Sequence, residues 1–459
     1  MAKTRSVNAE VFRSMPPGRA LLALAIPSIF AQVISVLYAV ADIFFVGQLG
    51  DPAQVAAVRI AFPPFLFLTA LANLLGIGAS SAIGRSLGAG DPEKARRCAA
   101  FAFWSGIIVA LVYSVLVMRG EPWLLPLLGA ASDTWGPTAE YLLWTVGLGA
   151  LPQVASNILA HLVRSEGHAK AAGNGIALGG VLNVLLAPIL IFSLGLEIRG
   201  AAIAVLISNI ASALFMAGYV LRRGREATVV RFSLRKAFEG AAHAGEIVSV
   251  GLASFVMTGM ASFSNAALNW LAAGYGAQAV AGLGIAKQVD QLIFSCSIGL
   301  AQGALPLVAY NYASGDHARL RAVVRVAVLG GVACSAAATA LLIAGSVPIA
   351  SAFIAESSTA GYASACVRII ALACPLSIIG HLMITGFQAC GARWRPLALA
   401  FLRKGAVDAP LMFLFSALWG FYGIAAAVPV SEFISSMIGL ALFIPFVRQL
   451  KGRDGKTQA

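Results

Sequence analysis

The feature that most constrains this chain is a series of long, continuous apolar segments. Twelve such runs occur, and a helix of about 20 apolar residues crosses the hydrocarbon core of a bilayer. The runs do not alternate between apolar and polar residues, which excludes the strands of a membrane barrel. We therefore predict helical spans at residues 20–46, 54–83, 98–118, 139–163, 171–194, 201–221, 246–271, 279–308, 323–345, 361–388, 396–418 and 422–447.

Composition supports an all-α membrane protein with twelve transmembrane helices. Apolar types make up 59% of the 459 residues and charged types 11%, whereas a soluble domain is about 25% charged. A soluble enzyme, a disordered chain and a secreted disulfide scaffold are thereby excluded. The six cysteines form no CxxC pair and lie mostly within apolar runs. We interpret them as small buried hydrophobes rather than as metal ligands or disulfides.

The distribution of basic residues predicts the orientation. Of the 32 Lys and Arg residues, 25 lie in the two tails and in every second connection, and only Arg119 and Arg199 lie in the opposite set. By the positive-inside rule, both termini are cytoplasmic and the number of spans is even. The net charge of +13 is then explained by cytoplasmic loops and needs no nucleic acid partner. We expect a multi-pass protein of the cell membrane, and specifically of the bacterial inner membrane.

The two halves of the sequence repeat each other. Val55–Ala61 aligns with Val280–Ala286 at an offset of 225 residues, and the same offset relates Gly90-Asp91 to Gly315-Asp316. Six spans per half give two parallel repeats, an arrangement that transporters use to form a cavity opened alternately to each side. The expected division is a cytoplasmic tail (1–19), an N-lobe (20–221), a cytoplasmic linker (222–245), a C-lobe (246–447) and a cytoplasmic C-tail (448–459). The linker either lies flat on the inner leaflet or forms a solvated loop.

Few residues in the spans can carry chemistry. No GxxxxGK[ST] motif occurs, so transport would be driven by a gradient or be passive. Asp42 stands in the outer half of the first span without a basic neighbour on its own helix. An unpaired carboxylate in a low-dielectric site binds a proton more readily than it does in water. We predict that Asp42 binds the coupling ion; the alternative is a carboxylate that reaches outer water or is fixed by a hydrogen bond.

Other polar residues could complete an ion site around Asp42. The candidates are Gln32, Tyr38, Asn157 and Asn183. Each of them alone more often makes a hydrogen bond between helices. Pro27 removes a backbone hydrogen bond from the first span. It could let that span bend with the protonation of Asp42, or it could mark a static kink.

The second half carries its own charges inside spans. Lys287 and Asp290 are three residues apart, and Lys404 and Asp408 are four apart, so each pair shares one helix face. These residues could line a polar cavity or form a proton relay. Alternatively, they are neutralised ion pairs that hold the eighth and eleventh spans together.

Several strings resemble the multidrug and toxic compound extrusion (MATE) transporters, including the branch similar to DinF and MepA. They are Ile26-Pro27, Tyr38-x3-Asp42-x2-Phe45-Val46-Gly47, Gly76-x-Gly78-Ala79, Gly88-Ala-Gly-Asp91, Arg164-x2-Gly167 and Asn183-x4-Pro188. The resemblance covers both halves. It implies efflux of organic cations or other amphipathic compounds in exchange for H⁺ or Na⁺. It also implies that Asp42 and Asn183 belong to an ion site in the N-lobe.

The sequence departs from this family at two positions. Many relatives have an Asp four residues after the Asn, where this chain has Ala187, and a Thr that is common in the sixth span is Val205. Two oxygen donors for Na⁺ are then missing, which favours H⁺ coupling. We expect a monomer that needs no cofactor beyond the coupling ion and takes a small-molecule substrate. The alternatives are a lipid-linked oligosaccharide flippase or an endogenous metabolite exporter of the same superfamily.

One motif suggests an enzyme instead. Gly88-Ala-Gly-Asp91 matches the GxGD pattern of intramembrane aspartyl proteases, which need two facing carboxylates within the membrane. Asp91 is followed by the charged segment Pro92–Arg97, which we place in a cytoplasmic loop. We therefore interpret the motif as a glycine that ends one helix and an aspartate that begins the next, and we predict that the chain is not an enzyme.

Overall fold

The computed structural model describes residues 9–223, 228–354 and 356–454. The described part is built of helices and contains no strand, which confirms the all-α fold class. The elements, of which η1, η2 and η4 are π-helical and η3 is 3₁₀, are α1 (Ala9–Arg13), α2 (Pro17–Gly47), α3 (Pro52–Gly88), α4 (Pro92–Leu127), α5 (Trp135–Leu142), η1 (Leu143–Gly147), α6 (Ala150–Ser165), α7 (Ala169–Pro188), η2 (Ile189–Ser193), α8 (Glu197–Arg222), α9 (Leu234–Gly240), η3 (Ala241–His243), α10 (Ala244–Ala273), α11 (Ala277–Ala313), α12 (His317–Ala344), α13 (Ser346–Phe353), α14 (Ser357–Ala371), α15 (Cys374–Ala389), α16 (Trp394–Phe401), η4 (Leu402–Ala406), α17 (Asp408–Trp419) and α18 (Phe421–Asp454).

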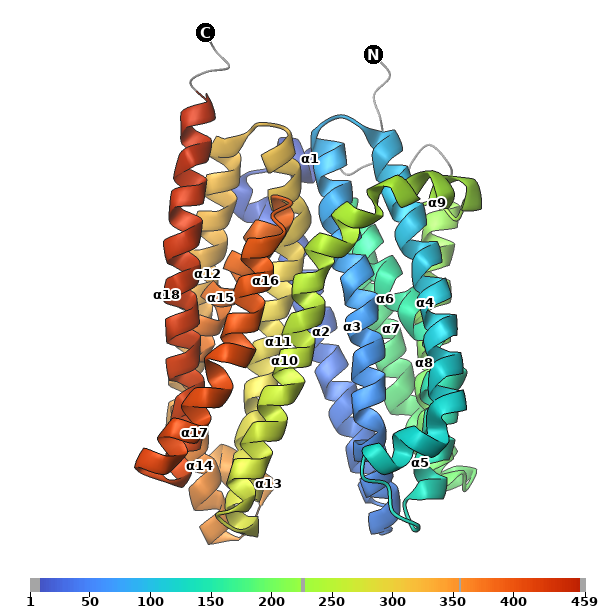
Figure 1. Ribbon diagram of the computed structural model, residues 1–459, viewed down its shortest axis with the longest axis vertical. Coiled ribbons are helices and arrows are strands. Elements are labelled where there is room, and N and C mark those ends of the chain that lie inside the picture. Colours follow the sequence, from blue (N-terminus) through green and yellow to red (C-terminus); the bar gives the residue numbers. More distant parts are fainter. Residues whose placement is uncertain (1–8, 224–227, 355, 455–459) are drawn as a thin grey trace.

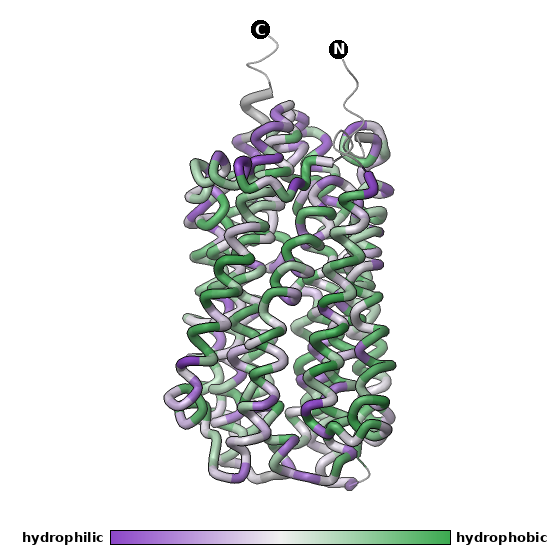
Figure 2. Tube along the Cα trace, turned by 90° about the vertical axis from the view of Figure 1, so that its right-hand side faces the viewer, coloured by the Kyte–Doolittle hydropathy of each residue, from purple (hydrophilic) through white to green (hydrophobic). Residues whose placement is uncertain are grey.

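The long helices lie roughly side by side in two groups (Figure 1). We call α2–α8 the N-terminal bundle and α10–α18 the C-terminal bundle. The first and last described helices, α1 and α18, reach the same end of the molecule, which we call the terminal end; the other is the distal end. The tube coloured by hydropathy is apolar along most of its length and more polar at both ends (Figure 2). This is the profile of a protein that spans a bilayer.

Nine helices in the described residues are long and apolar enough to cross a membrane, or eleven if two bent helix pairs each count as one span. The bent pairs are 135–165 and 357–389. The predicted span at 396–418 is divided among α16, η4 and α17, each too short to cross alone. The count of twelve spans therefore stays a prediction.

Helix boundaries follow from capping residues and proline. Asp51, Asp91 and Asp316 each precede a helix, and each side-chain carboxylate accepts a hydrogen bond from a backbone N–H in the first turn. Gly90 and Gly315 adopt positive φ angles of 79° and 77°. This confirms the interpretation of Gly-Asp as a helix end and helix start.

The same glycine turns reveal the repeat in three dimensions. Positive φ occurs at four pairs of glycines that are 224 to 226 residues apart, namely Gly50 and Gly276, Gly90 and Gly315, Gly167 and Gly391, and Gly195 and Gly420. Only glycine adopts such a backbone conformation without strain. The four turns thus recur in order along both halves and support the internal repeat predicted from the sequence.

The connection between the bundles is partly helical. α9 runs across the terminal end beside α4 (Figure 1). Its Glu239 pairs with Arg97 at 3.1 Å. Upstream, Glu166 Oε1 accepts hydrogen bonds from Val229 N at 2.6 Å and Val230 N at 2.9 Å. Burial raises the pKa of the Glu166 carboxyl to about 7, although these hydrogen bonds act in the opposite direction.

Candidate functional site

Asp42 lies near the distal end of α2, five residues before that helix ends at Gly47. Its side chain is buried with 6% exposed, and Oδ1 has no hydrogen-bond partner within the described residues. No ion pair reaches Asp42 in that part of the chain either. The carboxylate is thus held in the bundle without a compensating cation, as the sequence predicts.

The neighbours of Asp42 come from α2, α5 and α7. Asn183 is 1% exposed and lies within interaction distance of the Asp42 carboxylate. Its two carboxamide atoms are buried and have no hydrogen-bond partner within standard hydrogen-bond geometry in the described residues. Tyr38 and Tyr141 also interact electrostatically with Asp42. Sequence reasoning missed Tyr141, because α5 is a short helix at the start of a bent span and no pattern connects it to α2.

Close packing of α2 on α7 brings Asn183 to Asp42. A methyl group added to Gly180 would come within 2.4 Å of Ile34 Cγ2 and 3.4 Å of Tyr38 Cδ1. Gly173 similarly lies against the backbone of Pro27. Helix α2 is continuous through Pro27, and the predicted bending of α2 stays a prediction. Without a Cβ at these two glycines, the helix backbones approach closely.

One of the predicted partners of Asp42 lies elsewhere. Gln32 is ten residues before Asp42, about 15 Å along the helix, and its Nε2 donates to Gln302 Oε1 in the C-terminal bundle at 3.0 Å. The structure therefore places Gln32 in the contact between the bundles. Asn157 is half-buried on α6, and its part in the ion site stays a prediction.

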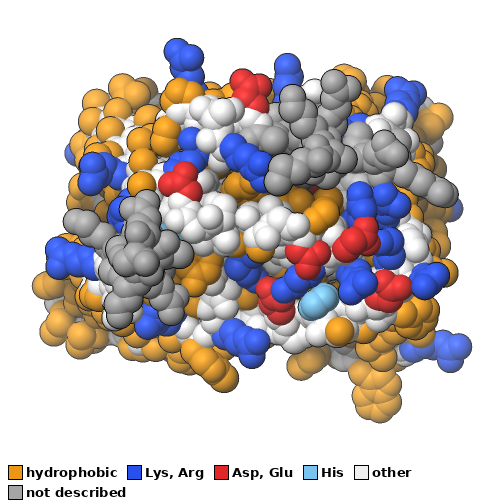
Figure 3. All heavy atoms as spheres, turned by 90° about the horizontal axis from the view of Figure 1, so that it is seen from above, with side chains coloured by type: hydrophobic (Ala, Val, Ile, Leu, Met, Phe, Trp, Pro, Cys, Tyr) orange, Lys and Arg blue, Asp and Glu red, His pale blue; other side chains and the backbone are white. Residues whose placement is uncertain are grey.

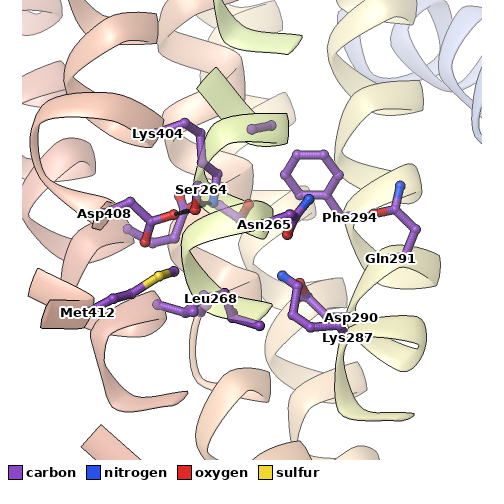
Figure 4. Close-up of a pocket in the computed structure, with 15 residues that line it drawn as sticks. Ser264, Asn265, Leu268, Lys287, Asp290, Gln291, Phe294, Lys404, Asp408 and Met412 are labelled. Atoms are coloured by element: carbon purple, nitrogen blue, oxygen red, sulfur yellow. Dashed lines mark hydrogen bonds and ion pairs between the residues drawn. The ribbon is translucent and has the colours of Figure 1, made fainter. Parts of the chain in front are cut away.

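The charged residues predicted in the second half meet in one cavity of the C-terminal bundle. This C-bundle cavity is partly open, and its empty volume of about 530 Å³ includes space open to solvent. Lys287 and Asp290 come from α11, Lys404 from η4 and Asp408 from α17 (Figure 4). Lys287 Nζ pairs with Asp290 Oδ2 at 2.8 Å, and Lys404 Nζ pairs with Asp408 Oδ2 at 3.6 Å.

These pairs do not join the predicted eighth and eleventh spans, because each pair lies within a single predicted span. The link between segments is made instead by Glu432 of α18, which is 2% exposed. Its Oε2 pairs with Arg403 Nε at 2.7 Å and its Oε1 with Lys404 Nζ at 3.0 Å. Arg403 NH2 also donates to Ser377 Oγ at 2.6 Å. Sequence reasoning placed Arg403 and Glu432 in spans but could not pair them.

The bundles contact each other in the terminal half. Arg85 of α3 pairs with Glu246 of α10 at 2.7 Å and donates to the carbonyl oxygens of Gln388 at 3.2 Å and Ala389 at 3.1 Å. Lys94 adds a second pair to Glu246 at 3.0 Å. Toward the distal end the two groups of helices diverge (Figure 1). The conformation is therefore closed at the terminal end.

Basic residues gather at this closed end. Arg and Lys side chains ring the terminal face, with acidic side chains among them (Figure 3). The excess of basic residues matches the side that the positive-inside rule assigns to the cytoplasm.

Comparison with known proteins decides the family. The MatE family profile matches residues 27–189 and again residues 253–414, one match in each half. The chain belongs to the MatE family. The two matches also agree with the repeat seen in the glycine turns.

Relatives in the MatE family cover nearly the whole chain. The Multidrug export protein MepA of Staphylococcus saprophyticus is 29% identical over 92% of this chain and 93% of its own length. MepA of Staphylococcus aureus is 28% identical over 94% of both chains. These relatives are named as export proteins and not as enzymes.

Solved structures agree with this assignment. The crystal structure of MATE in complex with MaL6 has a TM-score of 0.91 at 25% identity and covers 98% of this chain and 100% of its own. An outward-facing multidrug resistance MATE family transporter has a TM-score of 0.87 at 26% identity and covers 96% of this chain and 98% of its own. The present chain is thus a multi-pass membrane protein with the MATE fold.

Proposed function

We propose that this protein is a multidrug exporter of the bacterial inner membrane that exchanges cytoplasmic organic cations and amphipathic drugs for H⁺. The relatives named MepA are multidrug export proteins and match along almost the entire chain. The observation that carries the coupling is the buried, unpaired carboxylate of Asp42 beside Asn183. A secondary transporter needs such a group, one whose charge can be cancelled by the coupling ion.

The charge of Asp42 gives a physical rule for exchange. Moving a bare carboxylate through the low-dielectric centre of the protein costs free energy, and either a proton or a substrate cation removes that cost. The bundles would therefore change between their two open states when Asp42 is protonated or compensated, and not when it is bare. A proton entering at the distal side and a cation leaving there are then linked in one cycle.

The residues around the site favour H⁺ over Na⁺. Ala187 is fully buried in an apolar cluster that includes Val46 and Leu142, and Val205 is buried with 6% exposed. Neither side chain offers an oxygen. Na⁺ is a hard cation that prefers several oxygen ligands, whereas a proton needs only the carboxylate. The absence of oxygens at positions 187 and 205 therefore supports H⁺ as the coupling ion.

The orientation follows from charge. We assign the terminal end to the cytoplasm because basic residues dominate its connections, which makes the present conformation outward-facing. Aromatic side chains between the bundles would contact amphipathic substrates. Phe67 of α3 packs edge-on against Phe255 of α10, with ring centroids 5.4 Å apart, and 46% of the Phe67 side chain is exposed.

Transport in proteoliposomes tests the proposal. Vesicles are loaded with ethidium, and efflux is measured under an imposed pH gradient or an imposed Na⁺ gradient, without ATP. We expect the pH gradient alone to drive efflux by the wild type. Asp42→Asn should reduce this efflux to the leak rate of protein-free vesicles loaded with ethidium. The reason is that the Asn side chain can neither bind a proton nor carry a charge.

The matched control is Asp133→Asn, which removes an exposed carboxylate in the connection before α5 and should leave efflux unchanged. Size-exclusion profiles and melting temperatures establish that the variants fold. Efflux driven by pH at the wild-type rate in folded Asp42→Asn would overturn the role of Asp42. A response to Na⁺ alone would overturn H⁺ coupling.

A further inference from the structure

The C-bundle cavity has one acceptor atom whose role the ion pairs leave unexplained. Asp408 is 1% exposed, and its Oδ2 accepts from Ser264 Oγ at 2.6 Å and faces Lys404 Nζ at 3.6 Å. Its Oδ1 is buried and has no hydrogen-bond partner in the described residues. A buried carboxylate oxygen without a donor carries a free energy cost. A purely structural ion pair gives no reason to retain that cost.

The internal repeat relates this atom to the ion site of the N-terminal bundle. Asn183 lies between Gly167 and Gly195, whose repeat partners are 224 and 225 residues further along. The same separation leads from Asn183 to Asp408. The fifth predicted span of each half therefore contributes a polar residue at the equivalent position. This residue is the carboxamide of Asn183 in α7 and the carboxylate of Asp408 in α17.

The first helix of each bundle shows no such equivalence. The repeat partner of Asp42 is Ala267, and the cavity is lined two residues earlier by Asn265 of α10 (Figure 4). The cavity thus brings a carboxamide of α10 close to the carboxylate of the fifth span, although Asn265 does not stand at the repeat position of Asp42. The difference is that Asp408 has a resident cation, Lys404, whereas Asp42 has none within the described residues.

Lys404 forms a second ion pair, with Glu432, which would remain if a ligand bound to Asp408. Its Nζ is 3.0 Å from Glu432 Oε1, shorter than its 3.6 Å contact with Asp408. Glu432 uses its other oxygen for Arg403, so its two oxygens are both engaged. Asp290 uses its Oδ2 for Lys287 at 2.8 Å. Among the carboxylate oxygens of the cavity lining, Asp408 Oδ1 is the one that is both buried and without a hydrogen-bond partner in the described residues.

We propose that the C-bundle cavity binds an ammonium group that carries N–H donors, as part of an exported organic cation, with Asp408 Oδ1 as its acceptor and Lys404 as the resident cation that it displaces toward Glu432. This inference rests on the proposed function, since it assigns the cationic end of the substrate to one site. Phe294 of α11 and Met412 of α17 line the same cavity (Figure 4). Their apolar surfaces would contact the hydrocarbon part next to the ammonium group.

Equilibrium binding to the purified full-length protein tests the site. The probe is dansylcadaverine, a fluorescent primary ammonium, and its neutral counterpart is N-pentyl dansylamide. We expect Asp408→Asn to raise the Kd of the ammonium probe at least tenfold and that of the neutral probe less than twofold. Asn keeps the size of the side chain and can still accept from Ser264, so the substitution removes mainly charge.

Lys404→Gln is the deciding second variant. If Lys404 competes with the ligand for Asp408, its removal should lower the Kd of the ammonium probe at least threefold. If the Lys404–Asp408 pair only shapes the cavity, both variants should weaken binding together, and that result would overturn the proposal. Equal affinity of wild type and folded Asp408→Asn for the ammonium probe would overturn it too. Should Asp408→Asn elute as aggregate, Lys404→Gln decides alone.

The failure of this inference can be told apart from a failure of the proposed function. The transport assay on Asp42→Asn reports on proton coupling and does not involve Asp408. If pH-driven efflux depends on Asp42 while Asp408→Asn binds the ammonium probe normally, only the C-bundle site is wrong. If no gradient drives efflux by the wild type, the proposed function fails whichever way the binding result falls.

Discussion

Substitution Glu246→Gln should weaken the contact that closes the terminal end. Glu246 Oε1 is 2.7 Å from Arg85 and its Oε2 is 3.0 Å from Lys94, so one carboxylate of the C-terminal bundle holds two cations of the N-terminal bundle. Gln has the same shape, but it cannot form an ion pair. The neutral variant keeps one hydrogen bond to Arg85 and loses most of the attraction to Lys94.

The size of the effect follows from exposure. Hydrogen bonds to charged groups contribute about 1.5–3 kcal/mol when buried, and exposed ion pairs about 0.2–1 kcal/mol. The Glu246 side chain is 25% exposed, that of Arg85 13% and that of Lys94 32%, so solvent screens both pairs in part. We expect a loss of about 1–2 kcal/mol, which shifts the ratio of terminal-open to terminal-closed molecules by about 5- to 30-fold.

Double electron–electron resonance between two spin labels measures the ratio of terminal-open to terminal-closed molecules. Labels at Ala89, after α3, and Ser314, after α11, lie on exposed positions of the two bundles at the terminal end, in a protein whose exposed Cys334 is replaced by Ser. The fraction of molecules with a long distance between the two labels should be higher in Glu246→Gln than in the wild type. The matched control is Glu239→Gln, whose two ion pairs involve α9 and α4 and do not join the bundles. Equal distance distributions for Glu246→Gln and wild type would refute the reasoning.

Two further predictions concern packing and pH. Gly251→Ala should open the terminal end more strongly than Glu246→Gln, because the added Cβ would lie 1.8 Å from the carbonyl oxygen of Leu74. The control is Gly245→Ala, whose added Cβ would meet nothing within 4 Å and which should leave the spin-label distances unchanged. Glu166→Gln should remove a pH-dependent loss of stability. The pKa of the Glu166 carboxyl in the folded protein is about 7, against its ordinary value of 4.5. The free energy of unfolding of the wild type is therefore highest below pH 4.5 and falls by up to about 3 kcal/mol as the pH rises through 7. Melting temperatures of the wild type should therefore fall relative to Glu166→Gln between pH 5 and 8, and parallel curves would contradict this.

The sequence predicts the spans well because lipid imposes a strong constraint. A helix in hydrocarbon needs a long apolar run, and such runs are visible without knowledge of packing. The breaks within spans are not visible in this way. The π-helical segments at 143–147, 189–193 and 402–406 interrupt α-helical geometry, and no residue pattern in the apolar runs marks them.

The candidate site could be predicted from the sequence only where one residue is unusual by itself. Asp42 stands out because a carboxylate without a neighbouring cation is rare in a span. Gln32 shows the limit of this reasoning, since its partner Gln302 is 270 residues away. The pairing of Arg403 with Glu432 is equally invisible, because it depends on how η4 faces α18. Such partners follow from the packing of helices that are distant in the sequence, which one sequence does not specify.

Proton movement driven by substrate is the most direct test of the central claim, that Asp42 exchanges a proton for a cation. Proteoliposomes containing trapped pyranine, with equal pH on both sides, receive ethidium on one side only. The account predicts that ethidium entry changes the internal pH for the wild type and for Asp133→Asn, and not for Asp42→Asn. Ethidium entry with no change of internal pH in the wild type, or an undiminished pH change in folded Asp42→Asn, would contradict it.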